Sequence, residues 1–185
     1  MNRQMSTILD SGNRREFETG AVRDMIEGKG KCDLLPFDVV YDLYKHNFGE
    51  TDVTAETFYN LNKFTETGDV KYLQYVSAAL CRNVYVNGEH FENDDGSFES
   101  LSDMLLEVAK HFEDGAKKYG EYNWQKGIPV NCYIDSAVRH YLKYLRGDED
   151  ERHDRAFVWN ILCCIWTCKH KPELNGYLKK GEDDV

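Results

Sequence analysis

The sequence lacks several features that would place a chain of 185 residues in a specialised class. It has no apolar run near the roughly 18 residues that a membrane-spanning helix needs, and residues 1–20 lack the apolar core of a signal peptide. It also lacks a basic excess: 33 Asp and Glu stand against 23 Lys and Arg, for a formal net charge of -10. Proteins that coat nucleic-acid phosphates need the opposite balance. We therefore expect a soluble cytoplasmic protein that binds neither membrane nor nucleic acid.

The six cysteines lack the spacing of a zinc site, because no CxxC pair occurs. Three of them lie in the apolar run ILCCIWTC, and three stand alone: Cys32, Cys81 and Cys132. Free cysteine is among the most frequently buried residue types. Buried reduced thiols are therefore the favoured interpretation, with a metal site as the alternative.

The chain does have the material for one folded domain, since 41% of its residues are hydrophobic and 13% aromatic. Apolar residues at steps of three and four predict helices over 36–47, 71–85, 101–119, 130–146 and 149–168. The first should bury Val39, Val40, Leu43 and Tyr44. We interpret 48–98 as an insertion holding one helix, 1–20 as a loose polar segment, and the glycines around Arg23, Lys29 and Lys31 as a flexible arm or a phosphate contact.

Residues 111–160 concentrate the side chains that bind metals, phosphates and bases. Glu113 falls at the edge of an apolar stripe, with Lys117 one turn later, so it should be half-buried unless the two form an ordinary surface pair. Arg139 and Arg146 share one flank of the next helix with Asp135, which suggests an anion site. His140 projects to the other side, where it could be solvated.

The last predicted helix aims acidic residues at the core. With Ile161 at the centre of its buried face, Asp150 and Asp154 lie near that centre, and Glu151 and His153 flank it. Unpaired carboxylates on a buried stripe are costly, so a divalent metal is one explanation. The helix N-terminus, where acids are favoured, is the other.

Several ordered blocks resemble the phage-borne dATP/dGTP diphosphohydrolase family: TGAVRD, GKGKCDLLP, HFEDGAKKYGEYNWQKGIP, DSAVRH, GDEDERH and AFVWN. The resemblance implies an all-α helical bundle of the MazG-like nucleotide pyrophosphohydrolase type. Such an enzyme cleaves dGTP and dATP to the monophosphate and pyrophosphate with a divalent metal, Mg²⁺ or else Mn²⁺ or Co²⁺. It would serve the pathway that replaces adenine by 2-aminoadenine in some phage genomes, in the host cytoplasm. The sequence departs from the family pattern at Arg152 and Asp154.

The resemblance also implies roles for particular residues. The metal ligands would be Glu113, Asp150, Glu151 and His153, and either Glu113 or Glu151 would take a proton in catalysis. Deoxynucleoside triphosphate would be bound by Lys117, Lys118, Asn123, Trp124, Arg139 and His140, with Asn123 and Trp124 at the base. Trp124 could equally cover a small core. A homo-oligomer is the expected assembly.

Two other functions stay open at this stage. One is an HD-type triphosphohydrolase that would use His140, His153 and Asp154 and release triphosphate. The other is a non-catalytic phage protein that binds nucleotides or partners. The first lacks the additional His and Asp pattern that such sites require, and the second predicts no turnover at all.

Overall fold

Helices account for nearly all regular structure in the computed structural model of the chain. It describes residues 14–24, 32–49, 52–82 and 101–178, and the side chains of these except 77–82 and 101–104. Two short strands, β1 (Arg14–Glu16) and β2 (Val22–Asp24), pair in an antiparallel hairpin. The helices are α1 (Phe37–Phe48), α2 (Val53–Thr67), α3 (Lys71–Arg82), α4 (Leu101–Tyr119), α5 (Val130–Arg146) and α6 (His153–His170). The predicted all-α fold is thus confirmed.

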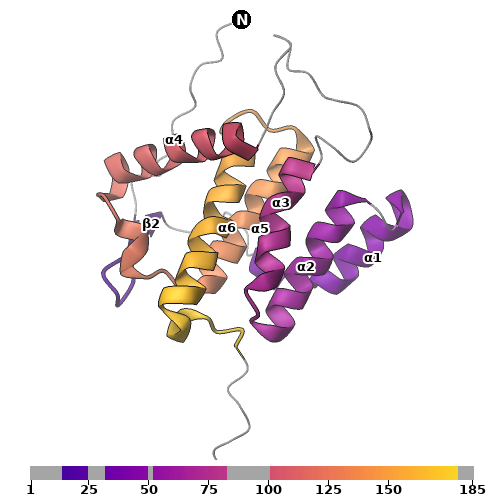
Figure 1. Cartoon of the computed structure of the whole chain (residues 1–185), viewed down its shortest axis with the longest axis horizontal. Coiled ribbons are helices and arrows are strands. Elements are labelled where there is room, and N and C mark those ends of the chain that lie inside the picture. Colours follow the sequence, from indigo (N-terminus) through magenta and orange to yellow (C-terminus); the bar gives the residue numbers. More distant parts are fainter. Residues whose placement is uncertain (1–13, 25–31, 50–51, 83–100, 179–185) are drawn as a thin grey trace, which may run out of the picture.

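The centre of the molecule is the pair α5 and α6, which lie side by side (Figure 1). Their shared surface buries large side chains completely, including Tyr133, Ile134 and Ile161. The rings of Tyr141 and Phe157 stack across it with centroids 4.9 Å apart. α4 packs on α6 from one side and α3 from the other, so α6 is enclosed on several faces. This enclosure explains why α6 is apolar around most of its circumference.

α2 was not predicted, and it shows that the supposed insertion contributes to the core. Asp52 caps the helix by accepting a hydrogen bond from the Ala55 N–H at 2.9 Å. Phe58, Leu61 and Phe64 are fully buried in the same apolar cluster as the central helices. The polar residues between and around them, such as Asn60, Asn62 and Lys63, hid this periodicity in the sequence. The helix predicted over 71–85 is confirmed as α3 up to Arg82, and 83–85 lie outside the described residues.

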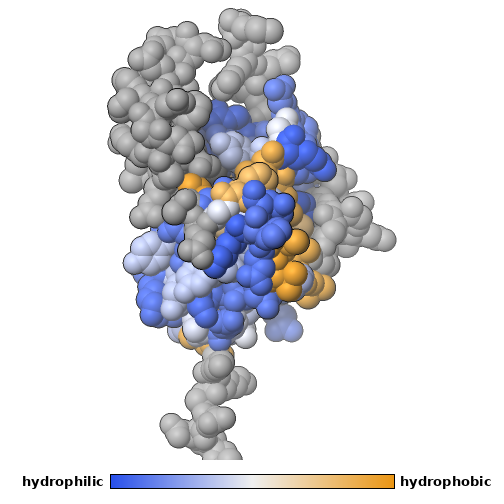
Figure 2. Space-filling view, turned by 90° about the vertical axis from the view of Figure 1, so that its right-hand side faces the viewer, coloured by the Kyte–Doolittle hydropathy of each residue, from blue (hydrophilic) through white to orange (hydrophobic). Residues whose placement is uncertain are grey.

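The buried face of α1 differs from the predicted one. Val39 is 50% exposed and Leu43 58% exposed, whereas Val40 and Tyr44 are half-buried. The fully covered residue is Phe37, whose ring packs against Phe58 with centroids 6.0 Å apart. The cause is position, because α1 lies at the edge of the molecule and packs chiefly on α2. Figure 2 shows the resulting apolar surface on this side of the molecule.

The hairpin corrects the expectation of a loose N-terminal segment in its described part. The Arg23 guanidinium donates to Cys132 O at 2.9 Å, Asn160 Oδ1 at 2.8 Å and Ser136 Oγ at 3.2 Å. Arg23 therefore joins the hairpin to α5 and α6 instead of belonging to a flexible arm. Lys29 and Lys31 lie outside the described residues.

Two further expectations concern membranes and thiols. None of the described helices combines the length and apolarity needed to cross a bilayer. Cys132, Cys163 and Cys164 are buried and Cys32 and Cys168 half-buried, all as free thiols, while the Cys81 side chain lies outside the described residues.

Candidate active site

A cavity of about 1120 Å³ lies among β2, α4, α5, α6 and the turn η2 (Asn123–Lys126). Its volume is slightly above the usual range of about 300–1000 Å³ for small-molecule sites. Five basic side chains line it: Arg15, Arg23, Arg139, Lys143 and Arg146. Aromatic side chains line it too: Phe112, Tyr119, Tyr122, Trp124 and Trp159. Such a cavity offers both cationic and flat apolar surface to one ligand.

The connection between α5 and α6 places the acidic residues differently from the prediction. Gly147 adopts a left-handed conformation (φ 82°) that ends α5, and α6 begins only at His153. Asp150 and Glu151 therefore precede the helix instead of lying on its first turn. Their exposure is the reverse of the expected order: the Asp150 side chain is 42% exposed, and Glu151 is 9% exposed. The inward-facing acid is Glu151.

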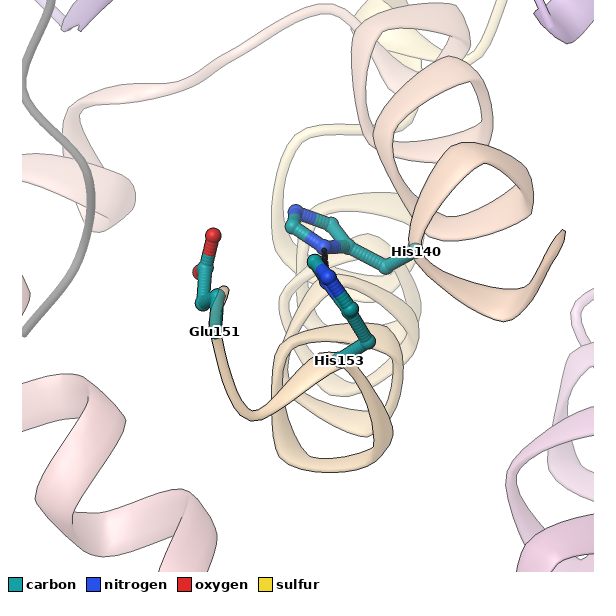
Figure 3. A group of neighbouring side chains, drawn as sticks. All are labelled: His140, Glu151 and His153. Carbon is teal, nitrogen blue, oxygen red and sulfur yellow. Dashed lines mark hydrogen bonds between the residues drawn. The ribbon is translucent and has the colours of Figure 1, made fainter. Parts of the chain in front are cut away.

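Three side chains meet beside the cavity in an arrangement that suits a metal ion. His140, Glu151 and His153 each offer one ligand atom, and these atoms lie within 4.8 Å of one another (Figure 3). The two imidazoles approach with their Nδ1 atoms 2.9 Å apart. Two nitrogens bound to one metal at about 2.0–2.1 Å lie roughly 3 Å apart, so this spacing fits a shared ion as well as a hydrogen bond.

When the rings of His140 and His153 are both neutral, their hydrogen bonds determine which nitrogen of each ring carries the proton. His153 Nε2 lies 2.7 Å from Asp150 Oδ1. That carboxylate only accepts, because its hydrogen bonds to His153 and Lys143 lower its pKa to about 2. His153 Nε2 therefore carries the proton, its Nδ1 accepts from His140 Nδ1–H, and His140 Nε2 keeps its lone pair. Asp150 thus orients His153 as a carboxylate partner orients a metal-ligating imidazole.

Glu151 makes no hydrogen bond through its carboxyl group within the described part of the chain, although it is buried. Burial, the largest effect, raises its pKa, which the nearby His153 and Lys143 only partly offset. His140 is half-buried, lines the cavity and contacts His153 through its ring. This burial, followed by the charge of His153, holds the pKa of His140 well below its ordinary value. The expectation that His140 is solvated is therefore wrong.

A second set of ligand atoms, from Asp148, Asp150 and His153, also lies within 4.8 Å. Its acids already have cationic partners, since Asp148 pairs with Arg146 and Asp150 lies 3.0 Å from Lys143 Nζ. The set that contains Glu151 has the greater need for a cation.

Glu113 and Lys117 form an exposed pair on α4. Their side chains are 64% and 66% exposed, and they are joined by an i, i+4 ion pair that lowers the pKa of Glu113. The predicted half-burial of Glu113 is therefore wrong. Glu113 lines the cavity, but neither set of ligand atoms found in the described residues includes it.

Two of the predicted phosphate-binding cations are paired with acids, one half-buried and one buried. Lys118, 7% exposed, lies 2.9 Å from Asp24 Oδ2, and Arg139 pairs with Asp135. Arg139 lines the cavity, as does Lys143 four residues later on the same helix. The sequence prediction missed Lys143, although its spacing from Arg139 places it on the same flank.

The predicted base-binding residues have roles in packing. The Asn123 amide donates to Val22 O at 2.9 Å and accepts from the Val22 N–H at 3.0 Å, which fixes η2 to the hairpin. Trp124 packs edge-on against Trp166 and tilted against Phe112, with centroids 5.0 and 5.4 Å apart. Trp124 was predicted either to contact the base or to cover a small core. These ring contacts correspond to covering a core.

The aromatic part of the cavity contains two side chains to which the sequence prediction gave no role. The rings of His111 and Trp159 lie 5.3 Å apart, and both residues line the cavity. His111 Nδ1 and Trp159 Nε1 are buried without a hydrogen-bond partner in the described structure. Burial lowers the pKa of His111 to about 3, so its ring is neutral.

The fold and site together define an all-α protein with a large cationic and aromatic cavity and a candidate metal group beside it. Residues 98–176 match the family model described as dATP/dGTP diphosphohydrolase, N-terminal. This match confirms the resemblance over the blocks from HFEDGAKKYGEYNWQKGIP to AFVWN, whereas TGAVRD and GKGKCDLLP lie outside it. It covers α4, η2, α5 and α6, which supply most of the cavity. Searches of curated proteins and of solved structures gave no significant match.

Proposed function

We propose that the protein is a metal-dependent diphosphohydrolase that converts dGTP and dATP to the nucleoside monophosphate and pyrophosphate. The observation that carries this proposal is the buried residue Glu151, which lines the cavity beside His140 and His153 and has no hydrogen bond through its carboxyl group in the described structure. A buried carboxylate without a cation costs free energy, and a metal shared with two imidazoles removes that cost. The family match supplies the substrate class.

The donor set bears on which metal is held. Glu151, His140 and His153 would be the ligands, and imidazole donors suit Mn²⁺, Co²⁺ or Zn²⁺ better than Mg²⁺, which prefers an all-oxygen shell. The ion would supply a Lewis acid that polarises a phosphoryl oxygen and lowers the pKa of a bound water. We therefore propose Mn²⁺ or Co²⁺ ahead of Mg²⁺.

Side chains of the protein would compensate the phosphate charge and accept the proton of the attacking water. Lys143 and Arg146 line the cavity and pair with Asp150 and Asp148 in the described structure. When substrate binds, they would turn to the phosphates and compensate their charge despite the acidic chain. Water adds to phosphorus, the anhydride bond between the α- and β-phosphates breaks, and the oxygen that leaves carries the electron pair. Glu151, whose pKa burial raises, is suited to receive the proton that the water gives up.

One observation favours the HD-type alternative, because His140 and His153 do meet. Its third predicted residue is engaged elsewhere: Asp154 accepts from Arg152 Nη2 at 2.6 Å and Nε at 3.0 Å. Asp154 is also absent from both ligand sets in the described residues.

Product analysis decides between these functions. Purified protein is incubated with each deoxynucleoside triphosphate and Mn²⁺, Co²⁺ or Mg²⁺, and products are separated by ion exchange. We expect dGMP and dAMP with pyrophosphate, and loss of turnover in EDTA. Deoxyguanosine with triphosphate would establish the HD-type reaction, and no turnover with any metal would support a non-catalytic role.

We also propose the wider setting that the resemblance implies: the 2-aminoadenine pathway of a phage, in the host cytoplasm, with a homo-oligomeric enzyme. Light scattering of the purified protein tests the last of these. A monomeric mass at micromolar concentration would reject it.

A further inference from the structure

The aromatic part of the cavity lies some distance from the candidate metal group along α6. Trp159 follows His153 by six residues, which is about 9 Å along a helix axis at 1.5 Å per residue. His111 on α4 completes this part, with its ring 5.3 Å from that of Trp159. A nucleotide whose phosphates lie near His140 and Glu151 would extend its base in this direction.

His111 and Trp159 each have a buried ring nitrogen without a hydrogen-bond partner in the described structure. A buried polar atom without a partner destabilises the fold. This destabilisation disappears if a ligand supplies the missing hydrogen bond. Both residues line the same cavity, but the two nitrogens themselves are buried, so one ligand satisfies both only if the two rings turn toward it.

The chemistry of the two nitrogens differs in a way that matches purines. Indole Nε1–H only donates, whereas Nδ1 of a neutral imidazole donates in one tautomer and accepts in the other. Adenine and guanine share the N7 acceptor but differ at position 6, where adenine has an amino donor and guanine a carbonyl acceptor. A fixed donor and a convertible group therefore complement both purines.

We propose that His111 and Trp159 form the base-recognition subsite, with Trp159 Nε1 donating to purine N7 and His111 Nδ1 pairing with either position-6 substituent by exchanging its tautomer. The proposal rests on the proposed function for its nucleotide substrate. It explains how one site accepts dATP and dGTP, and it excludes pyrimidines because they lack N7. His111 remains neutral in this role, because its environment disfavours a charge.

The test combines variants with nucleotides altered at one atom. Trp159→Phe removes the indole N–H but keeps an aromatic ring, and 7-deaza-dGTP replaces N7 by carbon. Binding is measured by calorimetry with Mn²⁺ and α,β-methylene analogues of dGTP, dATP, dCTP and 7-deaza-dGTP, which are not cleaved at that bond. We expect the 7-deaza analogue to bind the wild type about 3- to 10-fold more weakly than its dGTP counterpart, the loss of one hydrogen bond. Trp159→Phe should weaken dGTP-analogue binding similarly and show no further 7-deaza effect.

His111 is tested with a matched pair of substitutions. His111→Leu should weaken both purine analogues by a similar factor, whereas His111→Asn, whose amide can donate or accept, should restore most of the affinity for both. Trp166→Phe removes an indole N–H from a residue that does not line the cavity, and it should leave binding unchanged. Thermal melting confirms that each variant is folded.

The possible outcomes separate this proposal from the proposed function. If dGTP is hydrolysed but Trp159→Phe stays fully sensitive to 7-deaza substitution, or His111→Leu changes nothing, the subsite is overturned and the hydrolase stands. If the purine analogues bind with the expected pattern but no hydrolysis occurs, the subsite stands and the hydrolase fails. Failure of the wild type to bind any purine analogue rejects both.

Discussion

Two glutamates were predicted to bind metal, one on α4 and one in the connection between α5 and α6. The surroundings of their charges are opposite. Glu113 lies in solvent and pairs with Lys117 one turn away. Glu151 is buried next to two imidazoles and has no hydrogen bond through its carboxyl group in the described structure. A solvated pair needs nothing more, whereas a buried anion needs a cation. The comparison therefore favours Glu151 over Glu113 as a ligand of the proposed metal.

The largest expected effect is the loss of activity in Glu151→Gln. Removing the charge should reduce the turnover of dGTP at least about 100-fold, because it takes away both a metal ligand and the proton acceptor. Calorimetric titration with Mn²⁺ should show a parallel loss of binding. Glu113→Gln is the matched control, since it makes the same chemical change on the same cavity. Near-wild-type turnover in Glu151→Gln would remove the basis of the proposed function.

The next largest effect should come from the residue that orients His153. Asp150→Asn replaces the carboxylate that holds the Nε2–H of His153, and the amide can also present its donor to that nitrogen. Loss of such a supporting carboxylate typically costs 10–100-fold in metal affinity or activity. We expect about a tenfold rise in the Kd for Mn²⁺, with dGTP turnover at saturating metal largely restored. A turnover defect that saturating Mn²⁺ does not correct would instead assign Asp150 a direct role in the reaction.

Glu151→Gln should also have a smaller effect on folding stability. The same substitution that lowers turnover should stabilise the metal-free protein. Because burial raises the pKa of Glu151, the folded state holds this proton more tightly than the unfolded state does. The protonated form stabilises the fold at low pH, and that contribution is lost as the pH rises through the raised pKa. Glu151→Gln should therefore stabilise the metal-free protein by about 0.5–2 kcal/mol at pH 8 and by less at pH 5.

Thermal melting in EDTA at the two pH values measures this difference. Saturating Mn²⁺ should reverse the order, because a ligand bound only by the folded wild type raises its stability by mass action. A wild type that is more stable than Glu151→Gln in EDTA at pH 8 would mean that the carboxylate has a partner of its own.

The same contrast explains what the sequence could and could not predict. Periodicity located α4 and α5 because their apolar stripes are regular. It missed α2 because Asn and Lys residues stand between Phe58, Leu61 and Phe64. Acidic residues between Gly147 and His153 were predicted to bind a metal, and that role stays a prediction. Their burial was assigned wrongly, because a helical wheel does not apply to residues that precede the helix. The approach of His140 to His153, and of Arg23 to Asn160, depends on tertiary packing that no local pattern encodes.

The smallest expected effect belongs to Glu113→Gln, and it tests the comparison from the other side. The exposed pair with Lys117 should contribute little, so the free energy of unfolding should change by no more than about 0.5 kcal/mol. Turnover of dGTP and the affinity for Mn²⁺ should both stay within about threefold of the wild type, since Glu113 lies outside the two ligand sets. Lys117→Gln should behave in the same way if the pair has no part in catalysis. A loss of Mn²⁺ affinity as large as that of Glu151→Gln would show that Glu113 leaves Lys117 to join the metal when substrate binds, and α4 would then belong to the metal site.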